Sequence, residues 1–234
     1  MKRPELHRVE ILVLRTLRRS TSARFSELMK PTELKSDAFK FYVRRLRELG
    51  YISKDEDGNY SLTAVGKEFA NNLDEDIAMI QKQPKVSILI IIPKPKDKTR
   101  FLFQRRLRQP YYDFYGQLSG PVKWGEEIEV TAARELTKQT GLVGDCKVIG
   151  FYRQKDFDNT AELLLEDKLF SIVEAIVKDE VLENSWSGGY NEWMTLEEYM
   201  QKEKRFPATE RVLAMRATNQ TYASEMASYA PEEY

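Results

Sequence analysis

One stretch of 23 residues constrains the fold more than any other part of the chain: residues 120–142, with the sequence GPVKWGEEIEVTAARELTKQTGL. Its second half predicts a helix, because Ile128, Ala132 and Leu136 recur at helical spacing. Glutamates crowd the first turn, where the helix dipole favours negative charge. Gly141 then predicts the helix end. The glycines of the first half predict a loop that bends back across the helix start.

The same stretch resembles the Nudix box, whose pattern is Gly, five residues, Glu, seven residues, Arg-Glu-aliphatic, one residue, Glu-Glu, one residue, Gly-aliphatic. Most of its fixed positions are matched without a gap, by Gly120, Glu126, Arg134, Glu135, Leu136, Gly141 and Leu142. The two positions that fail are the paired glutamates, which here are Lys138 and Gln139. The resemblance implies a Nudix fold for the domain that contains this stretch.

The failed positions change the chemistry that the resemblance implies. In the family, carboxylates at i, i+3 and i+4 of the helix hold a divalent cation that activates water. Here that face has Glu135, Lys138 and Gln139, and one carboxylate beside an ammonium is a poor Mg²⁺ site. We therefore expect no catalytic residue, metal ligand or cofactor, and we expect Glu126 and Arg134 to tie the loop to the helix. If the domain is active, Glu135 and Glu126 are the catalytic candidates, Glu135 is the metal ligand, and Mg²⁺ or Mn²⁺ is the cofactor.

Charge is unevenly distributed along a chain that is long enough for one large or two ordinary domains. The whole sequence has 37 basic and 37 acidic residues, but residues 1–54 have 14 Lys and Arg against 6 Asp and Glu. Residues 155–203 have 4 Lys against 13 Asp and Glu. This asymmetry predicts a basic N-terminal surface with an anionic partner; the alternative is two solvated surfaces that merely differ.

The single cysteine, Cys146, excludes an internal disulfide and is consistent with a reducing compartment. No signal peptide is seen, and the longest apolar run, residues 86–92, is too short to span a bilayer. We expect a cytoplasmic protein with no membrane partner.

The N-terminal part is patterned as helix, short helix, helix, hairpin, helix. The predicted helices cover residues 4–19, 25–29 and 36–49, with Ser36 as the N-cap of the third. An Asp-Gly turn separates two short strands within residues 51–62, and Thr63 caps a further helix. This order resembles a winged helix-turn-helix domain over residues 4–78.

The resemblance implies that the third helix lies in the major groove of double-stranded DNA. The expected DNA-binding residues are Lys35, Ser36, Lys40, Arg44 and Arg45. The tip of the hairpin, residues 55–57, is acidic, which argues against phosphate contacts there. The alternative is that the domain mediates protein interaction or dimerisation.

The second domain resembles the Nudix fold over residues 85–216. Strands are predicted at residues 86–93, 99–106, 147–154 and 169–177, a capping box at Thr195 and Glu198, and a last helix at residues 210–226. The aromatic run at residues 110–116 could stack on a base or pack under a loop. The expected ligand-binding residues are Arg105, Tyr112, Phe114, Lys123, Glu135 and Lys138. Glu162 and Glu166 are loose candidates for a further metal ligand.

The predicted fold class is α+β with two domains, a winged helix-turn-helix followed by a Nudix α/β/α sandwich with a mixed sheet. The predicted boundaries are residues 1–78 for the winged helix, 79–84 for a linker, 85–216 for the Nudix-like domain and 217–234 for a helix end and tail.

This combination resembles the Nudix-related transcriptional regulators, although in that group the winged helix follows the Nudix domain. The resemblance implies a DNA-binding regulator whose catalytically impaired Nudix domain senses a nucleotide-like small molecule. A homodimer is expected, because one winged helix reads only a half-site. The alternatives are a Nudix hydrolase of nucleoside diphosphate-linked substrates with an atypical metal site, and a protein–protein adaptor.

Overall fold

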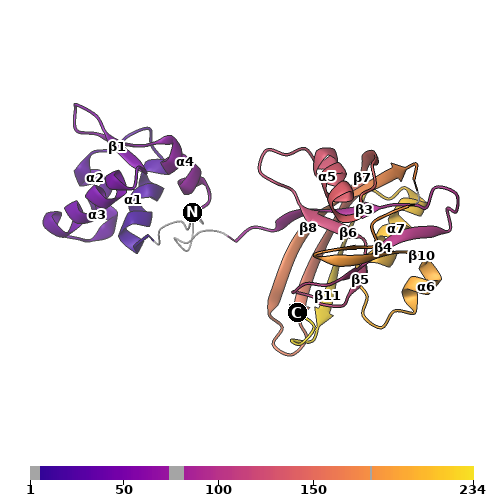
Figure 1. Ribbon diagram of the computed structural model, residues 1–234. Coiled ribbons are helices and arrows are strands. Elements are labelled where there is room, and N and C mark those ends of the chain that lie inside the picture. Colours follow the sequence, from indigo (N-terminus) through magenta and orange to yellow (C-terminus); the bar gives the residue numbers. More distant parts are fainter. Residues whose placement is uncertain (1–5, 74–81, 180) are drawn as a thin grey trace. The chain divides into compact units, whose positions relative to one another are not determined.

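The chain divides into two compact units, Met1–Lys82 and Gln83–Tyr234 (Figure 1). The computed structural model describes residues 6–73, 82–179 and 181–234. The division falls within the predicted linker, of which residues 79–81 lie outside the described residues. Each unit has a hydrophobic core of its own, as expected of an independent domain.

The N-terminal unit has the predicted winged-helix order. Its elements are α1 (Arg8–Arg18), α2 (Phe25–Met29), the 3₁₀ helix η1 (Lys30–Thr32), α3 (Ser36–Glu48), β1 (Ile52–Lys54), β2 (Tyr60–Leu62) and α4 (Ala64–Asn71). β1 and β2 form the expected antiparallel hairpin. The helices meet around Leu14, Leu28, Phe39 and Leu46, all of which are fully buried. This packing holds α3 against the other helices and leaves its opposite side in solvent.

Two of the predicted helix caps belong to the N-terminal unit. Thr63 does cap α4, since its Oγ1 accepts a hydrogen bond from the backbone N–H of Gly66 at 3.0 Å. The prediction that Ser36 caps α3 is wrong. Lys35 is the extended N-cap residue, its side chain makes no capping bond, and Ser36 is the first helical residue.

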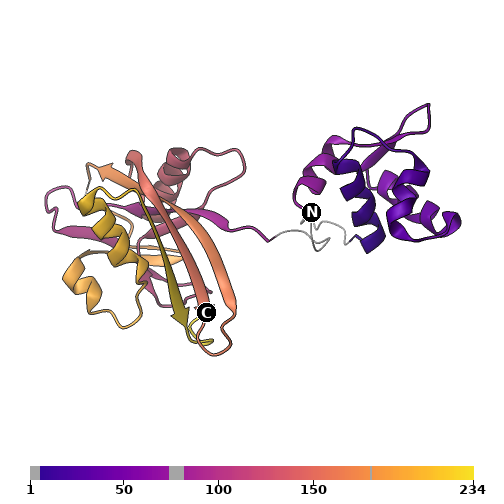
Figure 2. The same cartoon turned by 180° about the vertical axis from the view of Figure 1, so that it is seen from behind.

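The described residues of the C-terminal unit form two sheets and three helices, whose arrangement is shown in Figures 1 and 2. One sheet has the strand order β5-β4-β10-β9, and the other, which is mixed, has the order β11-β7-β8-β3-β6. The strands are β3 (Lys85–Ile91), β4 (Arg100–Arg106), β5 (Tyr115–Gly116), β6 (Leu118–Pro121), β7 (Gly144–Asp158), β8 (Leu164–Val177), β9 (Ser185–Trp186), β10 (Gly189–Thr195) and β11 (Tyr222–Tyr229). The helices are α5 (Ile128–Thr140), α6 (Leu196–Met200) and α7 (Ala208–Thr218).

Helices α5 and α7 cover opposite faces of the mixed sheet. Ile88 and Ile90 of β3 belong to the core that contains α5, whereas Leu89 and Ile91 belong to the core that contains α7. Alternate residues of a strand point to opposite faces, so the two helices lie on the two sides of the sheet. This confirms the predicted α/β/α arrangement with a mixed sheet.

The box helix begins and ends close to where the sequence predicts. Gly141 follows α5 with a left-handed φ of 72°, which confirms it as the helix stop. Gly120 is required for a different reason, because a Cβ there would lie 2.5 Å from Cγ of Glu135. The backbone of β6 at Gly120 therefore lies directly against the box helix, α5.

Two predictions about the C-terminal half are wrong. The last helix ends at Thr218, Asn219 turns the chain with a left-handed φ of 55°, and residues 222–229 form β11 rather than more helix. The polar residues 156–167, which lie between the predicted strands 147–154 and 169–177, are also largely strand, since β7 continues to Asp158 and β8 begins at Leu164. Asp156 and Glu166 are buried there and find polar partners, namely Gln154 and Lys85. Hydrophobic pattern alone cannot identify polar residues that are buried in this way.

Candidate functional site

Helix α3 presents a basic face to solvent. Lys40, Arg44 and Arg47 follow one another at i, i+4 and i+7, so they lie on one side of the helix, and all three are exposed. They line a shallow hollow together with Phe41 and Tyr60. Arg47 was not among the expected DNA-binding residues, although helical spacing from Lys40 and Arg44 indicates it.

Acidic neighbours partly neutralise this basic face. Lys40 Nζ lies 3.0 Å from a carboxylate oxygen of Asp37, and Arg44 Nε lies 3.7 Å from one of Glu48. All four side chains are well exposed, so each pair is weak and can exchange for phosphate. Lys35 and Ser36 are exposed at the start of the same helix.

Arg45 points away from this face and into the domain. Its Nη1 donates a hydrogen bond of 2.7 Å to Oε2 of Glu10, a residue of α1 that is completely buried. The backbone N–H of His7 donates to the same oxygen at 2.8 Å. The structure thus gives this predicted DNA-binding residue a partner inside the protein, because the position on the helix turns its side chain toward α1.

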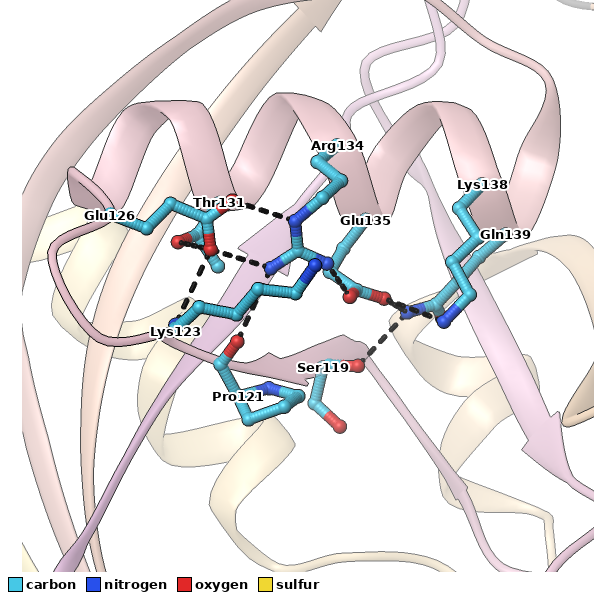
Figure 3. A network of polar contacts seen from close by, with 9 residues as sticks. All are labelled: Ser119, Pro121, Lys123, Glu126, Thr131, Arg134, Glu135, Lys138 and Gln139. Carbon is cyan, nitrogen blue, oxygen red and sulfur yellow. Dashed lines mark hydrogen bonds and ion pairs between the residues drawn. The ribbon is translucent and has the colours of Figure 1, made fainter.

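A network of polar contacts joins α5 to the box loop, residues 122–127 between β6 and α5 (Figure 3). Arg134 donates from Nε and Nη2 to the two carboxylate oxygens of Glu126, at 2.7 Å each. Thr131 donates to Glu126 at 2.8 Å. The hydrogen bonds from Arg134, with that from Thr131, lower the pKa of Glu126 to about 2. Glu126 and Arg134 thus have the geometry of the expected tie between loop and helix.

Gln139 takes the place of a box glutamate and is fully hydrogen-bonded. Its Nε2 donates to Oε2 of Glu135 at 2.7 Å and to the backbone carbonyl of Ser119 at 3.0 Å (Figure 3). Its Oε1 accepts a bond of 3.1 Å from Gln104. A carboxylate at this position could not donate either of the first two bonds, so the amide is part of the scaffold.

Glu135 has basic and amide donors where the family would place a metal. Its Oε1 accepts a hydrogen bond from Arg134, and its Oε2 lies 3.9 Å from Nζ of Lys138 as well as bonding Gln139. Lys138 also lies over the ring of Trp186, at 5.2 Å from the centroid. A divalent cation requires several oxygen ligands, whereas these side chains offer one carboxylate amid donors. The residues at the box therefore do not fit the metal that the family implies.

A cavity of about 220 Å³ opens beside β6. Ser119, Gly120 and Pro121 form one wall. The cavity is notable for its basic lining, which comes from Lys85, Arg106, Arg108 and Lys168. Glu166 is its only acidic lining residue among the described part of the chain.

Burial perturbs the charged groups of this cavity. Burial lowers the pKa of Lys168, although Asp156, whose carboxylate lies 3.6 Å from Nζ, opposes that shift. Burial alone would raise the pKa of Glu166, but the hydrogen bond from Lys85 and the charge of Lys168 bring it below its usual value. Tyr111 donates a hydrogen bond of 2.6 Å to Asp156 behind the wall. The two carboxylates hold the lysines in place without balancing all the positive charge of the lining.

The expected ligand-binding residues do not line this cavity. Arg105 is ion-paired with Asp113, and Tyr112 is half exposed. Phe114 is buried against Tyr111 and Tyr229, so its ring packs under the loop and has no free face for a base. Lys123 lies in the box loop, where its backbone N–H donates to Glu126.

The cavity residues that sequence reasoning missed were only partly detectable. Arg106 adjoins Arg105, which was predicted to bind the ligand. Neighbouring residues of a strand point to opposite faces, so Arg106 and not Arg105 faces the cavity. Lys85 and Lys168 are distant in sequence and meet only because β3 pairs in parallel with β8, where they are direct partners. No local pattern predicts that pairing.

The described residues form neither a metal site with several side-chain ligands nor a membrane-spanning helix. In residues 6–73, 82–179 and 181–234, no group of three or more His, Cys, Asp or Glu side chains is arranged to hold a metal ion. Over the same ranges, no helix has the length and apolarity needed to cross a membrane.

Comparison with known proteins places both domains in families. The sequence model of the NUDIX domain matches residues 82–215, and that of a winged helix-turn-helix domain matches residues 7–81. No curated protein sequence matches the chain significantly.

Three of the similar solved structures are described as NUDIX proteins. The NUDIX domain of Shewanella oneidensis NrtR, crystallised with ADP ribose, is 16% identical, and the match covers 67% of this chain and 99% of that one with a TM-score of 0.49. A NUDIX hydrolase from Nitrosomonas europaea is 18% identical over 60% of this chain and 93% of that one, with a TM-score of 0.47. A MutT NUDIX hydrolase from Burkholderia pseudomallei is 19% identical over 57% of this chain and 98% of that one, also at 0.47. Since the family model matches more than half of the chain, the protein belongs to the NUDIX family, with a winged helix-turn-helix domain preceding its NUDIX domain.

Proposed function

We propose that the protein is a DNA-binding transcription regulator whose NUDIX domain senses an anionic, nucleotide-type metabolite without hydrolysing it. Ligand and DNA would be linked through two arrangements of the protein that differ in affinity for both. The proposal rests above all on one observation: a cavity with four basic side chains and one carboxylate adjoins a box helix that lacks its paired glutamates.

The lining of the cavity favours phosphate as the bound group. Two of the four basic side chains, Arg106 and Lys168, are partly buried. Basic groups of this kind that are not balanced by carboxylates gain most from an anion, and arginine in particular suits phosphate oxygens. The cavity is smaller than the roughly 300–1,000 Å³ of sites that enclose a drug-sized ligand. We therefore expect it to hold the phosphate-bearing part of a nucleotide, with the remainder bound outside the cavity.

The contacts of the box support binding without hydrolysis. Metal-assisted attack by water needs carboxylates that hold the cation. Glu135 is instead ion-paired with Arg134 and hydrogen-bonded by the amide of Gln139, and Lys138 adds a further positive charge. A fixed positive charge at the box can attract a phosphate, but it cannot activate a water molecule as a metal does.

The exposed face of α3 supports binding of double-stranded DNA. Lys40, Arg44 and Arg47 lie on one side of a helix of 13 residues, which fits a major groove about 12 Å wide. The hairpin adds Lys54, whereas its tip has the acidic Asp55, Glu56 and Asp57. We expect phosphate contacts from α3 and the base of the hairpin rather than from its tip.

The ligand can be tested by thermal unfolding of the full chain with a panel of nucleotides. The panel contains ADP-ribose, nicotinamide dinucleotides, nucleoside di- and triphosphates and nucleotide sugars, each with Mg²⁺ and with EDTA. We expect one of them to raise the melting temperature equally in both conditions and to be recovered intact by chromatography. Stabilisation that requires Mg²⁺ and ends in cleavage of the ligand would instead make the protein a NUDIX hydrolase.

DNA binding can be tested by the salt dependence of affinity for a duplex. Each phosphate that the protein neutralises should contribute about −0.9 to the slope of log K against log salt concentration. Addition of the ligand found above should change the affinity. An affinity that ignores ionic strength would contradict DNA binding and would favour an adaptor protein.

A further inference from the structure

Strand β11 forms one edge of the mixed sheet. It pairs in parallel with β7 along its whole length, from Tyr222 opposite Phe151 to Tyr229 opposite Asp158, and Figure 2 shows it as the yellow strand beside β7. Within the described part of the chain, no strand pairs with its other side. An edge strand of eight residues is long enough to act as a template for another strand.

The outward backbone groups of β11 can be assigned. The carbonyl of Thr221 accepts a hydrogen bond of 2.8 Å from the N–H of Phe151 in β7. The carbonyl of Tyr229 accepts one of 3.0 Å from the N–H of Asn159, the residue that follows β7. Successive residues of a strand direct these groups to opposite sides, so Tyr222 and every second residue after it direct them to the free edge. The carbonyl of Tyr222 does so, since it accepts from the side chain of Gln220 at 2.8 Å instead of from β7.

This edge lacks the features by which proteins usually prevent strand pairing. It has no proline, no lysine and no bulge in its register with β7. Its only charged residue, Glu225, points to the inner face. There its carboxylate accepts a hydrogen bond of 3.1 Å from the hydroxyl of Tyr152 and lies 3.2 Å from Nε of Arg211. On the outer face, Met226 is 73% exposed, and Tyr222 and the adjacent Phe151 are also exposed.

We propose that β11 pairs antiparallel with β11 of a second copy of this chain, about a two-fold axis at Met226, so that the two mixed sheets become one. Strands that pair across a two-fold axis must be self-complementary. This register sets Met226 against the partner's Met226 and Ser224 against the partner's Ser228, and the outward N–H and C=O groups meet one another. A register shifted to an axis at Glu225 would set two like charges in opposition, which disfavours it.

A second copy fits this edge better than an unrelated strand does, because a winged helix contacts only one DNA half-site and a dimer supplies two. That choice of occupant rests on the proposed function. The pairing itself depends only on β11, and it can be measured without DNA or nucleotide.

The test exploits the two-fold axis by replacing one residue with opposite charges. In Met226→Glu or Met226→Lys, like charges would meet across the axis, so we expect each variant to dimerise about tenfold or more weakly than the natural protein in analytical ultracentrifugation. An equimolar mixture sets Glu against Lys and should recover a dimer that contains both variants. Val143→Glu, at an exposed position immediately before β7 and outside the part of β7 that pairs with β11, is the matched control and should dimerise normally.

The proposal is overturned if the natural protein is monomeric at every concentration, or if both Met226 variants dimerise as it does. It is also overturned if the mixture stays monomeric while each variant keeps its native circular dichroism. Because the measured quantity is mass, these results are separable from a failure of ligand or DNA binding.

Discussion

Arg45 provides the sharpest test of how the winged helix divides its basic residues between stability and DNA. In Arg45→Ala, the buried carboxylate of Glu10 loses the donor that lies 2.7 Å away and keeps only the N–H of His7. Breaking a buried ion pair costs about 3–5 kcal/mol, and because the side chain of Arg45 is 35% exposed we expect the lower end, about 3 kcal/mol. For a domain of this size each kcal/mol lowers the melting temperature by about 4–8 °C, so we expect a fall of about 12–24 °C in the calorimetric transition of the winged-helix unit.

Arg47→Ala is the matched control, because it removes the same charge from the exposed face of the same helix. It should change the melting temperature by no more than about 4 °C, since surface substitutions rarely change stability by more than about 0.5 kcal/mol, and it should reduce the salt slope of DNA binding by about 1. The pair Glu10→Leu with Arg45→Met should recover most of the lost stability, as apolar replacements of buried ion pairs often do. The reasoning is refuted if Arg45→Ala melts normally but loses DNA affinity as Arg47→Ala does, because Arg45 would then be a DNA contact.

Three further predictions concern the NUDIX domain. The double change Lys138→Glu with Gln139→Glu restores the family carboxylates. We expect calorimetry to show that the domain without metal is destabilised by about 3 kcal/mol and that Mg²⁺ stabilises it again. A melting temperature that does not respond to Mg²⁺ would contradict our account of the box. Lys168→Met should reduce the affinity for the nucleotide identified by thermal unfolding by about 10–100-fold in titration calorimetry. Arg105→Met, outside the cavity, should change that affinity by less than about threefold. Equal losses of affinity would argue against the cavity as the site. Glu126 has a pKa of about 2 in the folded protein and 4.5 ordinarily, so it contributes stability above pH 4.5 that is lost as the pH falls toward 2. Glu126→Gln should therefore flatten the curve of melting temperature against pH between these values. Parallel curves for the two proteins would count against the tie between Glu126 and Arg134.

The sequence by itself determined the two domains and the framework of each. The box stretch, the helix stop at Gly141 and the capping residue Thr63 are local signals, because a glycine with positive φ or a hydroxyl at a helix start acts on backbone within a few residues. The replacement of the box glutamates by Lys138 and Gln139 could likewise be read directly, since residues at i+3 and i+4 share a helix face whatever the domain around them.

Only the tertiary structure decided which basic residues face a site and which stabilise the fold. Arg45 and Arg47 are equally basic in sequence, but one meets Glu10 from a different helix and the other meets solvent. The cavity depends on strand pairing between Lys85 and Lys168, which are distant along the chain. The local pattern predicts helix as far as residue 226, over the first part of β11, whereas the strand forms there because β7 supplies backbone partners. In each case the deciding contact joins segments far apart in the sequence, and local patterns contain no record of such contacts.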